Sequence, residues 1–252
     1  MLKKLVVIQI LFLCLCSLSF TKDGYFPEDR PAIESLELLP PPPEMKIDNS
    51  NFKLDIDIST AYINDIDFIT GKKIAPEIKN QAEADRVKTP EYIVSSFIKP
   101  IDDIPENIKN EIVKQTVNII EKVSEDARNA TNSAKDFYNR KRPCEYLNKK
   151  IPEAIKKCSK KDLKTGSYPS GHATRGMIAA YTLIEILPDE YRKQLFLRGV
   201  EFGDSRVILG VHWQSDVDAS RRLALAVFKK LRENKQFQLD IKKAKGKLST
   251  LN

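Results

Sequence analysis

Histidine is nearly absent from this sequence, whose 252 residues contain only His172 and His212. Transition metals in proteins are usually bound by imidazole and thiolate groups, or by carboxylates clustered with histidine. No such cluster can be read from the chain, so we predict neither a resident metal nor another cofactor. Any histidine chemistry of this protein must depend on these two side chains.

Glycine is also scarce, at nine residues, and runs of alternating apolar and polar residues, which would indicate strands, are few. Good helix formers such as lysine, glutamate and leucine are abundant. Hydrophobic residues make up 41% of the chain and charged residues 31%, which is ordinary for a globular protein with one substantial core. We therefore predict an all-α fold, a single-domain helical bundle that covers residues 61–235.

The sequence lacks an apolar run long enough for a comfortable membrane span. Its most apolar segment, residues 5–18, follows a short basic start and ends in small residues, as in a secretory signal peptide. We predict a signal peptide over residues 1–19 and a periplasmic or secreted protein with no integral membrane span after cleavage. An uncleaved anchor is the alternative; a lipoprotein is disfavoured by the leucines that precede Cys14 and Cys16.

Cysteine is limited to four residues, two of which lie in the predicted signal peptide. The other two, Cys144 and Cys158, would be exported with the mature chain. Two cysteines in an exported protein usually pair, so we predict a disulfide between them.

The charge of the chain is basic, with a formal net charge of +7. Removal of residues 1–19, which contain two lysines and no acidic residue, leaves +5. A basic protein can bind any anionic partner, nucleic acid included. Because both signs of charge are mixed along most of the chain, we interpret the lysines as a solvated surface and predict no nucleic-acid partner.

The two ends of the mature chain show little helical periodicity. Residues 20–60 predict an extended arm, in which four consecutive prolines, Pro40 to Pro43, favour a polyproline II segment. This segment would be either a stiff spacer that lies over the domain or a docking motif for a partner. Residues 236–252 are basic and polar, and predict a frayed tail.

Between the arm and the tail, apolar residues recur with helical spacing. Short helical pieces broken by prolines are predicted for residues 60–100, and a lysine-rich connection for residues 144–168. Longer helices are predicted for residues 105–123, 126–141, 171–187, 190–202 and 215–233.

Three segments contain residues that could bind phosphate. In the first, Lys135 and Arg142 are seven residues apart, and on one helix they would lie on nearly the same face. In the second, Ser170 is a natural N-cap for a helix whose free N–H groups and dipole attract anions. Gly171 lets an anion approach the backbone, and His172 would stand beside it. Each segment, taken alone, also fits a purely structural role.

The third segment contains the other histidine. His212 and Asp216 are four residues apart, which suits a carboxylate that accepts a hydrogen bond from the imidazole ring. Such a bond selects the tautomer and leaves the other ring nitrogen free as a nucleophile. Arg206 supplies a planar fork that matches phosphate oxygens. Both histidines therefore fall in the two segments best suited to bind phosphate.

In this order, the three segments resemble the signature of the type 2 phosphatidic acid phosphatase superfamily, which also includes the vanadium haloperoxidases. The stretches GSYPSGHAT (166–174) and SRVILGVHWQSDV (205–217) are most similar to the secreted bacterial class A non-specific acid phosphatases, a group that includes periplasmic apyrases. The four prolines and the leucine before them also resemble the N-terminal region of that group. The motifs cover residues 135–216, and a weaker likeness extends over about 36–235.

The resemblance implies an all-α bundle of that superfamily's kind and a phosphohistidine intermediate. His212 would attack phosphorus, Asp216 would orient and charge it, and His172 would act as general acid and base. The phosphoryl oxygens would be bound by Lys135, Arg142, Ser170, Gly171 and Arg206. Members often carry a cysteine where this chain has Leu209, so Cys144 is the substitute partner that we predict for Cys158.

The implied activity is the hydrolysis of soluble phosphomonoesters, nucleotides among them, at acidic pH and without a metal. Inorganic phosphate or vanadate would inhibit, and the resemblance suggests a homodimer. Three alternatives stay open: an apyrase acting on nucleoside di- and triphosphates, a vanadate-dependent haloperoxidase, and an exported interaction protein that docks through the proline segment.

Overall fold

The computed structural model describes residues 24–250, and over these residues the chain is helical, without a strand. The prediction of an all-α fold is confirmed. None of the helices in this part of the chain is both long and apolar enough to cross a membrane. The predicted signal peptide lies outside the described residues and stays a prediction.

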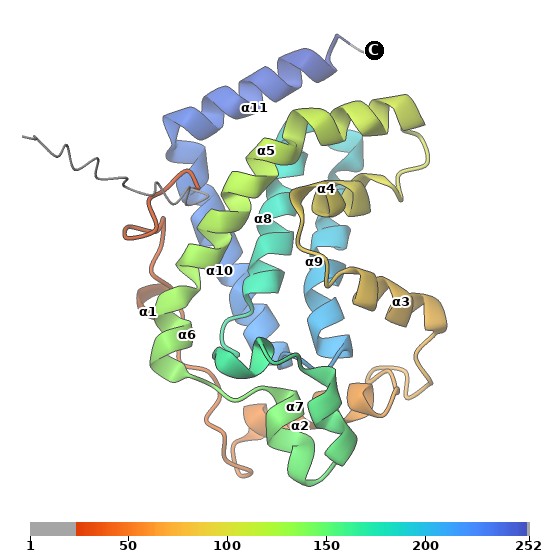
Figure 1. Cartoon of the computed structure of the whole chain (residues 1–252), viewed down its shortest axis with the longest axis vertical. Coiled ribbons are helices and arrows are strands. Elements are labelled where there is room, and N and C mark those ends of the chain that lie inside the picture. Colours follow the sequence, from red (N-terminus) through yellow and green to blue (C-terminus); the bar gives the residue numbers. More distant parts are fainter. Residues whose placement is uncertain (1–23, 251–252) are drawn as a thin grey trace, which may run out of the picture.

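The helix α8 (Gly171–Ile186) forms the centre of the core (Figure 1). It packs against α9 (Arg192–Ile208) and α10 (Gln214–Glu233) on either side, and α5 (Glu106–Ala130) lies across it. Small residues allow the closest of these contacts: a Cβ atom added at Gly199 would lie 2.6 Å from the Cβ of Ala180. The lower ends of α8, α9 and α10 lie together in Figure 1. His172 is in the first turn of α8, and His212 is in the loop that joins α9 to α10.

Two of the prolines that were predicted to break short helices are instead the first residues of helices. Pro76 is the first residue of α3 (Pro76–Ala84), and Pro90 is the first residue of α4 (Pro90–Ile98). Proline suits this position because its fixed φ is helical and its missing N–H would have no partner there. The α4 helix packs on α5 and contacts the upper part of α8 and α9.

The N-terminal arm is less extended than predicted. Residues 24–49 contain only the single turn α1 (Ser35–Leu38), but α2 (Ser50–Ile63) is a full helix. Asn49 caps α2 by accepting a hydrogen bond from the N–H of Phe52 at 3.0 Å. The helix buries Phe52, Ile58 and Ile63, and acidic residues between these apolar ones hide the helical period in the sequence.

The C-terminal residues do not form the predicted tail. They form the helix α11 (Lys235–Leu248), which packs on α5, α8 and α10. Asn234 caps it by accepting hydrogen bonds from two backbone N–H groups. Phe237, Ile241 and Ala244 are spaced by four and three residues, so they share one face and are buried. The lysines that surround these three residues in the sequence obscure this short stripe.

A disulfide joins Cys144 in α7 (Pro143–Tyr146) to Cys158, the pair predicted from the sequence. The bridge spans a sequence separation of 14 and closes a loop of short helical turns. In the chain-entropy model, a loop of this size stabilises a fold by about 3 kcal/mol, because the cross-link restricts the unfolded chain.

We therefore expect the double substitution Cys144→Ser, Cys158→Ser to lower the free energy of unfolding by about 3 kcal/mol in urea titrations. Reduction of the unsubstituted protein should give the same loss, whereas reduction of the double variant should change nothing. A double variant as stable as the oxidised protein would show that the bridge does not stabilise the fold.

Candidate active site

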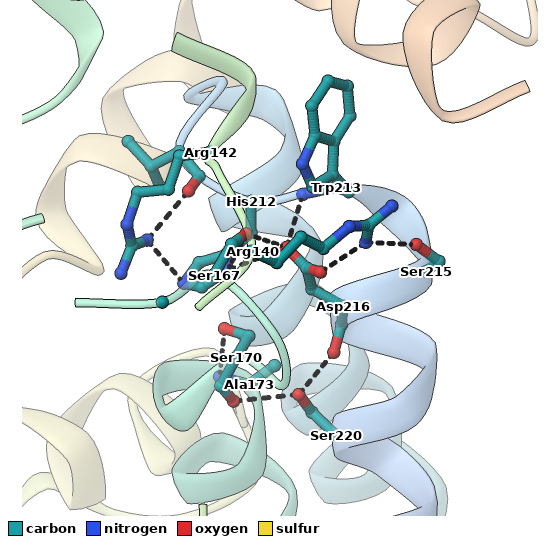
Figure 2. A network of polar contacts seen from close by, with 12 residues as sticks. Arg140, Arg142, Ser167, Ser170, Ala173, His212, Trp213, Ser215, Asp216 and Ser220 are labelled. Carbon is teal, nitrogen blue, oxygen red and sulfur yellow. Dashed lines mark hydrogen bonds and ion pairs between the residues drawn. The ribbon is translucent and has the colours of Figure 1, made fainter. Parts of the chain in front are cut away.

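The N-terminus of α8 forms one wall of the site (Figure 2). Ser170 is its N-cap, and its Oγ accepts a hydrogen bond from the N–H of Ala173 at 3.3 Å. Gly171 begins the helix, and a Cβ atom added there would lie 3.9 Å from Cε of Lys135. The first and second predicted segments therefore meet at this helix end, where free N–H groups and the helix dipole favour an anion.

The loop between α9 and α10 brings His212 to the same place. This loop turns at Gly210, whose φ of +65° is in the left-handed region that favours glycine. Nδ1 of His212 lies 3.2 Å from Oδ2 of Asp216, which is in the first turn of α10. Both side chains are buried, and the same carboxylate oxygen accepts the N–H of Trp213 at 2.9 Å.

The contacts of His212 select one tautomer of its ring. Its Nε2 lies 2.9 Å from Nη1 of Arg142, which can only donate, so Nε2 must accept. The proton of the neutral ring is then on Nδ1, where Asp216 accepts it. Burial, followed by the charge of Arg142, lowers the pKa of His212 to about 3, so the ring is neutral at any ordinary pH. His212 therefore has its lone pair on Nε2.

Asp216 is kept ionised in spite of its burial. Burial alone would raise the pKa of this carboxyl, but the charge of Arg140 and hydrogen bonds from His212 and Ser167 outweigh it. The net effect holds the pKa of Asp216 well below its usual range. A permanent carboxylate at this position can stabilise positive charge on His212.

His172 differs from His212 in having no polar partner. Among the residues described, neither of its ring nitrogens has a hydrogen-bond partner, and the ring stacks on Phe202 with centroids 4.3 Å apart. Burial lowers the pKa of His172 well below its ordinary value, and the neighbouring charge of Arg206 lowers it further. A buried imidazole without a partner is available to exchange a proton with a bound molecule.

Three predicted cations converge on the two histidines. Lys135 donates to the carbonyl of Gly166 at 2.8 Å. Burial, and after it the charge of Arg142, lowers the pKa of Lys135 to about 7. Nη2 of Arg206 donates to the carbonyl of Ala82 at 2.8 Å, and burial lowers its pKa to about 10.

Arg142 is held by the polypeptide backbone. Its guanidinium donates to the carbonyls of Asp162 at 2.7 Å and Val211 at 2.9 Å. Within residues 24–250, neither Arg142 nor the other two cations forms an ion pair with a carboxylate. These three cations are largely buried and have no ion-pair partner. They therefore indicate a site for an anion.

The structure changes how Lys135 and Arg142 come together. The predicted single helix over residues 126–141 is wrong, because α5 ends at Ala130 and α6 (Asn132–Tyr138) ends at a left-handed Asn139. Arg142 follows as the N-cap residue of α7. Similarly, α9 continues past the predicted end at residue 202, so that Arg206 lies in its last turn.

Sequence reasoning missed Arg140, which lies behind Asp216. Its Nη1 donates to Oδ1 of Asp216 at 2.6 Å and to Oγ of Ser215 at 2.8 Å (Figure 2). Its Nη2 donates to Oδ2 of Asp55 at 2.9 Å. Asp55 belongs to α2 and also accepts the N–H of Ser215 at 3.0 Å. These two buried carboxylates thus share one arginine. In the sequence, only its position two residues before Arg142 indicated that Arg140 could belong to the site.

Ser167 was also missed. Its hydroxyl donates to Oδ2 of Asp216 and lies 3.5 Å from Nδ1 of His212. With Arg140 and Trp213, it supplies donors to both oxygens of the carboxylate. In the part of the chain that the structure covers, no group of three or more His, Cys, Asp or Glu side chains could hold a metal ion.

Residues 123–233 of the chain match the family described as the PAP2 superfamily. A non-specific acid phosphatase of Providencia stuartii is 35% identical over 236 residues, which cover 91% of this chain and 86% of that protein. A non-specific acid phosphatase of Salmonella typhimurium is 42% identical over 127 residues, or 49% of this chain and 48% of that protein. An acid phosphatase of Zymomonas mobilis is 38% identical over 119 residues, or 46% of this chain and 42% of that protein.

Proposed function

Because this chain belongs to the PAP2 superfamily, and within it to the bacterial class A non-specific acid phosphatases, we propose that it hydrolyses soluble phosphomonoesters through a phosphohistidine at His212. One observation above all supports this mechanism. Three cations, Lys135, Arg142 and Arg206, surround two buried histidines at a capped helix end, and no carboxylate of the described residues pairs with any of them.

In the first step, the lone pair on Nε2 of His212 attacks phosphorus, and the bond from phosphorus to the leaving oxygen breaks. Arg142, which donates to Nε2, would transfer this hydrogen bond to a phosphoryl oxygen when substrate binds. Asp216 stabilises the positive charge that develops on the ring. His172 donates a proton to the leaving oxygen, which then departs as an alcohol.

In the second step, a water molecule attacks the phosphohistidine. His172, now neutral, takes a proton from this water, and the bond between phosphorus and Nε2 breaks. Inorganic phosphate is released and His212 recovers its lone pair. Both steps pass through a transition state with negative charge on the phosphoryl oxygens.

The phosphate-binding residues have to stabilise that charge. We assign this role to five groups: Lys135, Arg142, Arg206, the hydroxyl of Ser170 and the backbone N–H of Gly171. Preorganised donors in a site that excludes water are the largest contribution to many enzymatic rate enhancements. Because these cations and the helix end supply positive charge, the proposed reaction needs no metal.

Nucleotides are proposed as substrates, and phosphate and vanadate as inhibitors, because each presents a tetrahedral or trigonal oxyanion to the same cations. Periplasmic or secreted localisation rests on the predicted signal peptide, and the homodimer rests on the family resemblance. No contact of the described residues favours a haloperoxidase, and the relatives above are phosphatases by name.

The proposed mechanism predicts that hydrolysis of AMP, whose leaving oxygen needs a proton from His172, is faster in acid and is insensitive to EDTA. The direction of this pH dependence follows from the shifted pKa of three groups. His212, with a pKa of about 3, keeps its lone pair down to about that pH, and Lys135, with a pKa of about 7, gains its charge below neutrality. His172, whose pKa is lowered, is protonated only as the pH falls.

We expect kcat/KM to rise as the pH falls from about 8 to about 5, by up to about tenfold per pH unit while one protonation controls the rate. The measurement is a pH profile of kcat/KM in EDTA. Addition of Mg²⁺ or Zn²⁺ in excess of EDTA at each pH is the control and should not raise the rate. An optimum above pH 7, or a rate that metal restores, would contradict the proposed mechanism.

A further inference from the structure

Two cations next to His172 belong to none of the three motifs. Arg175 follows His172 by three residues on α8, so the two side chains leave the helix on the same side, one turn apart. Lys88 lies between α3 and α4. This connection follows the end of α3 where Arg206 donates to the carbonyl of Ala82 at 2.8 Å, so it begins at the edge of the site.

Neither cation is neutralised by the protein. Over the described residues, Arg175 and Lys88 form no hydrogen bond and no ion pair. The acids that act on them most strongly, Glu125 and Asp162, have other partners. Glu125 pairs with Arg128 at 2.7 Å, and Asp162 accepts from the N–H and the hydroxyl of Ser159.

The charges of both cations affect the pKa of His172, which agrees with the position of Arg175 one helical turn after His172. Burial is the largest cause of the lowered pKa of His172. The charges of Arg206, Arg175 and Lys88 follow, in that order. Arg175 in turn is the first charged group, after burial, that lowers the pKa of Lys88. Exposure decreases from Lys88, which is at the surface, through the half-buried Arg175 to the buried His172.

Within the proposed mechanism, the neighbourhood of His172 belongs to the leaving-group side of the reaction. In an in-line displacement, the nucleophile His212 and the proton donor His172 are on opposite sides of phosphorus. Arg175 and Lys88 lie progressively closer to the surface than His172, so within the proposed mechanism they would contact the part of the leaving group that extends outward, not the phosphoryl oxygens. A half-buried arginine without a partner is costly to desolvate, and an anionic ligand would supply the missing partner.

We propose that Arg175 and Lys88 form a second anion subsite, which binds the phosphate of the leaving group when the substrate is a nucleoside diphosphate. This inference rests on the proposed function. His212 would attack the terminal phosphorus, the bond to the bridging oxygen would break, and the nucleoside monophosphate would leave. Its negative charge would be stabilised by the two cations, and because a phosphate is a weak base it would need little help from His172.

The test compares ADP, whose leaving group is AMP, with AMP, whose leaving group is the uncharged adenosine. Hydrogen bonds to charged groups contribute about 1.5–3 kcal/mol, so we expect Arg175→Ala to lower the ratio of kcat/KM for ADP to that for AMP by about tenfold or more. Lys88→Ala should lower the same ratio by a smaller factor because this side chain is exposed. Arg175→Lys, which keeps the charge but not the fork, should recover part of the ratio.

Arg192→Ala is the matched control, because it also removes one arginine but at an exposed position at the start of α9. Its ratio should equal that of the unsubstituted protein. Release of AMP and phosphate from ADP is followed by ion-exchange chromatography, and circular dichroism verifies that each variant is folded. The surface variant Lys88→Ala keeps the test available even if Arg175→Ala fails to fold.

Three results would contradict the proposal of a second anion subsite. One is an unchanged ratio in the Arg175 and Lys88 variants. Another is an equal loss for both substrates, which would mean that the cations attract any anion. The third is an unsubstituted protein that hydrolyses AMP but not ADP. Failure of the unsubstituted protein to hydrolyse p-nitrophenyl phosphate would instead contradict the proposed function itself, so the two failures are distinguishable.

Discussion

His212→Ala is expected to lower kcat for p-nitrophenyl phosphate by roughly 10⁴-fold or more, because it removes the proposed nucleophile. The remaining cations would still bind phosphate, so inhibition by inorganic phosphate should persist. Enzyme mixed with ³²P-labelled substrate and quenched should show an alkali-stable, acid-labile phosphohistidine. The label should be absent from the His212→Ala variant.

The variant His172→Ala distinguishes the proposed roles of the two histidines. The p-nitrophenolate leaving group needs little protonation, so the first step should survive, whereas the second step loses its base. We therefore expect this variant to accumulate the labelled phosphohistidine while its steady-state rate falls by about 10²- to 10⁴-fold. If His212→Ala retained the label and His172→Ala lost it, the assignment of the two histidines would have to be reversed.

The residues of the candidate active site could be predicted because their signals are local. The spacing of four residues between His212 and Asp216 already predicts a ring–carboxylate contact, and the structure has it at 3.2 Å. Ser170 could be predicted as an N-cap from the apolar run that follows it, and it does cap α8. Their catalytic roles stay predictions.

Arg140 shows what local signals cannot supply. Its two carboxylate partners, Asp55 and Asp216, are 85 and 76 residues away in the sequence. Nothing in a run of basic residues indicates which arginine will be buried between two acids. Asp55 was additionally hidden in a segment predicted to be extended. Long-range pairing of polar groups depends on the packing of helices, which a single sequence does not encode in any short pattern.

The same limit applies to the fold. The helices α8 and α10 were predicted well, because each has a long apolar pattern, and Pro188 additionally marks the end of α8. The helices α2 and α11 were missed, since each buries only a few residues against partners far away in the chain. In both, one capping asparagine, Asn49 or Asn234, was the local signal that could have revealed the helix start.

Substitution of Arg140 by methionine should be among the most damaging changes outside the motif residues. It leaves the buried carboxylates of Asp55 and Asp216 without their shared cation, and breaking a buried pair in this way costs about 3–5 kcal/mol. It also frees Asp216 to move, and misplacement of a catalytic group by about 1 Å can cost 10²-fold in rate. We expect kcat to fall by about that factor, with KM changed much less.

Arg198→Met is the matched control, because Arg198 forms an equally buried pair with Asp85 but makes no hydrogen bond to either histidine or to Asp216. Urea unfolding should show a similar loss of stability in both variants, yet only Arg140→Met should lose kcat at temperatures where both are folded. The double variant Asp55→Asn, Arg140→Met removes one uncompensated charge and should regain stability but not kcat. Arg140→Lys keeps the charge and should recover part of kcat; equal kcat in the Arg140→Met and Arg198→Met variants would show that Arg140 only stabilises the fold.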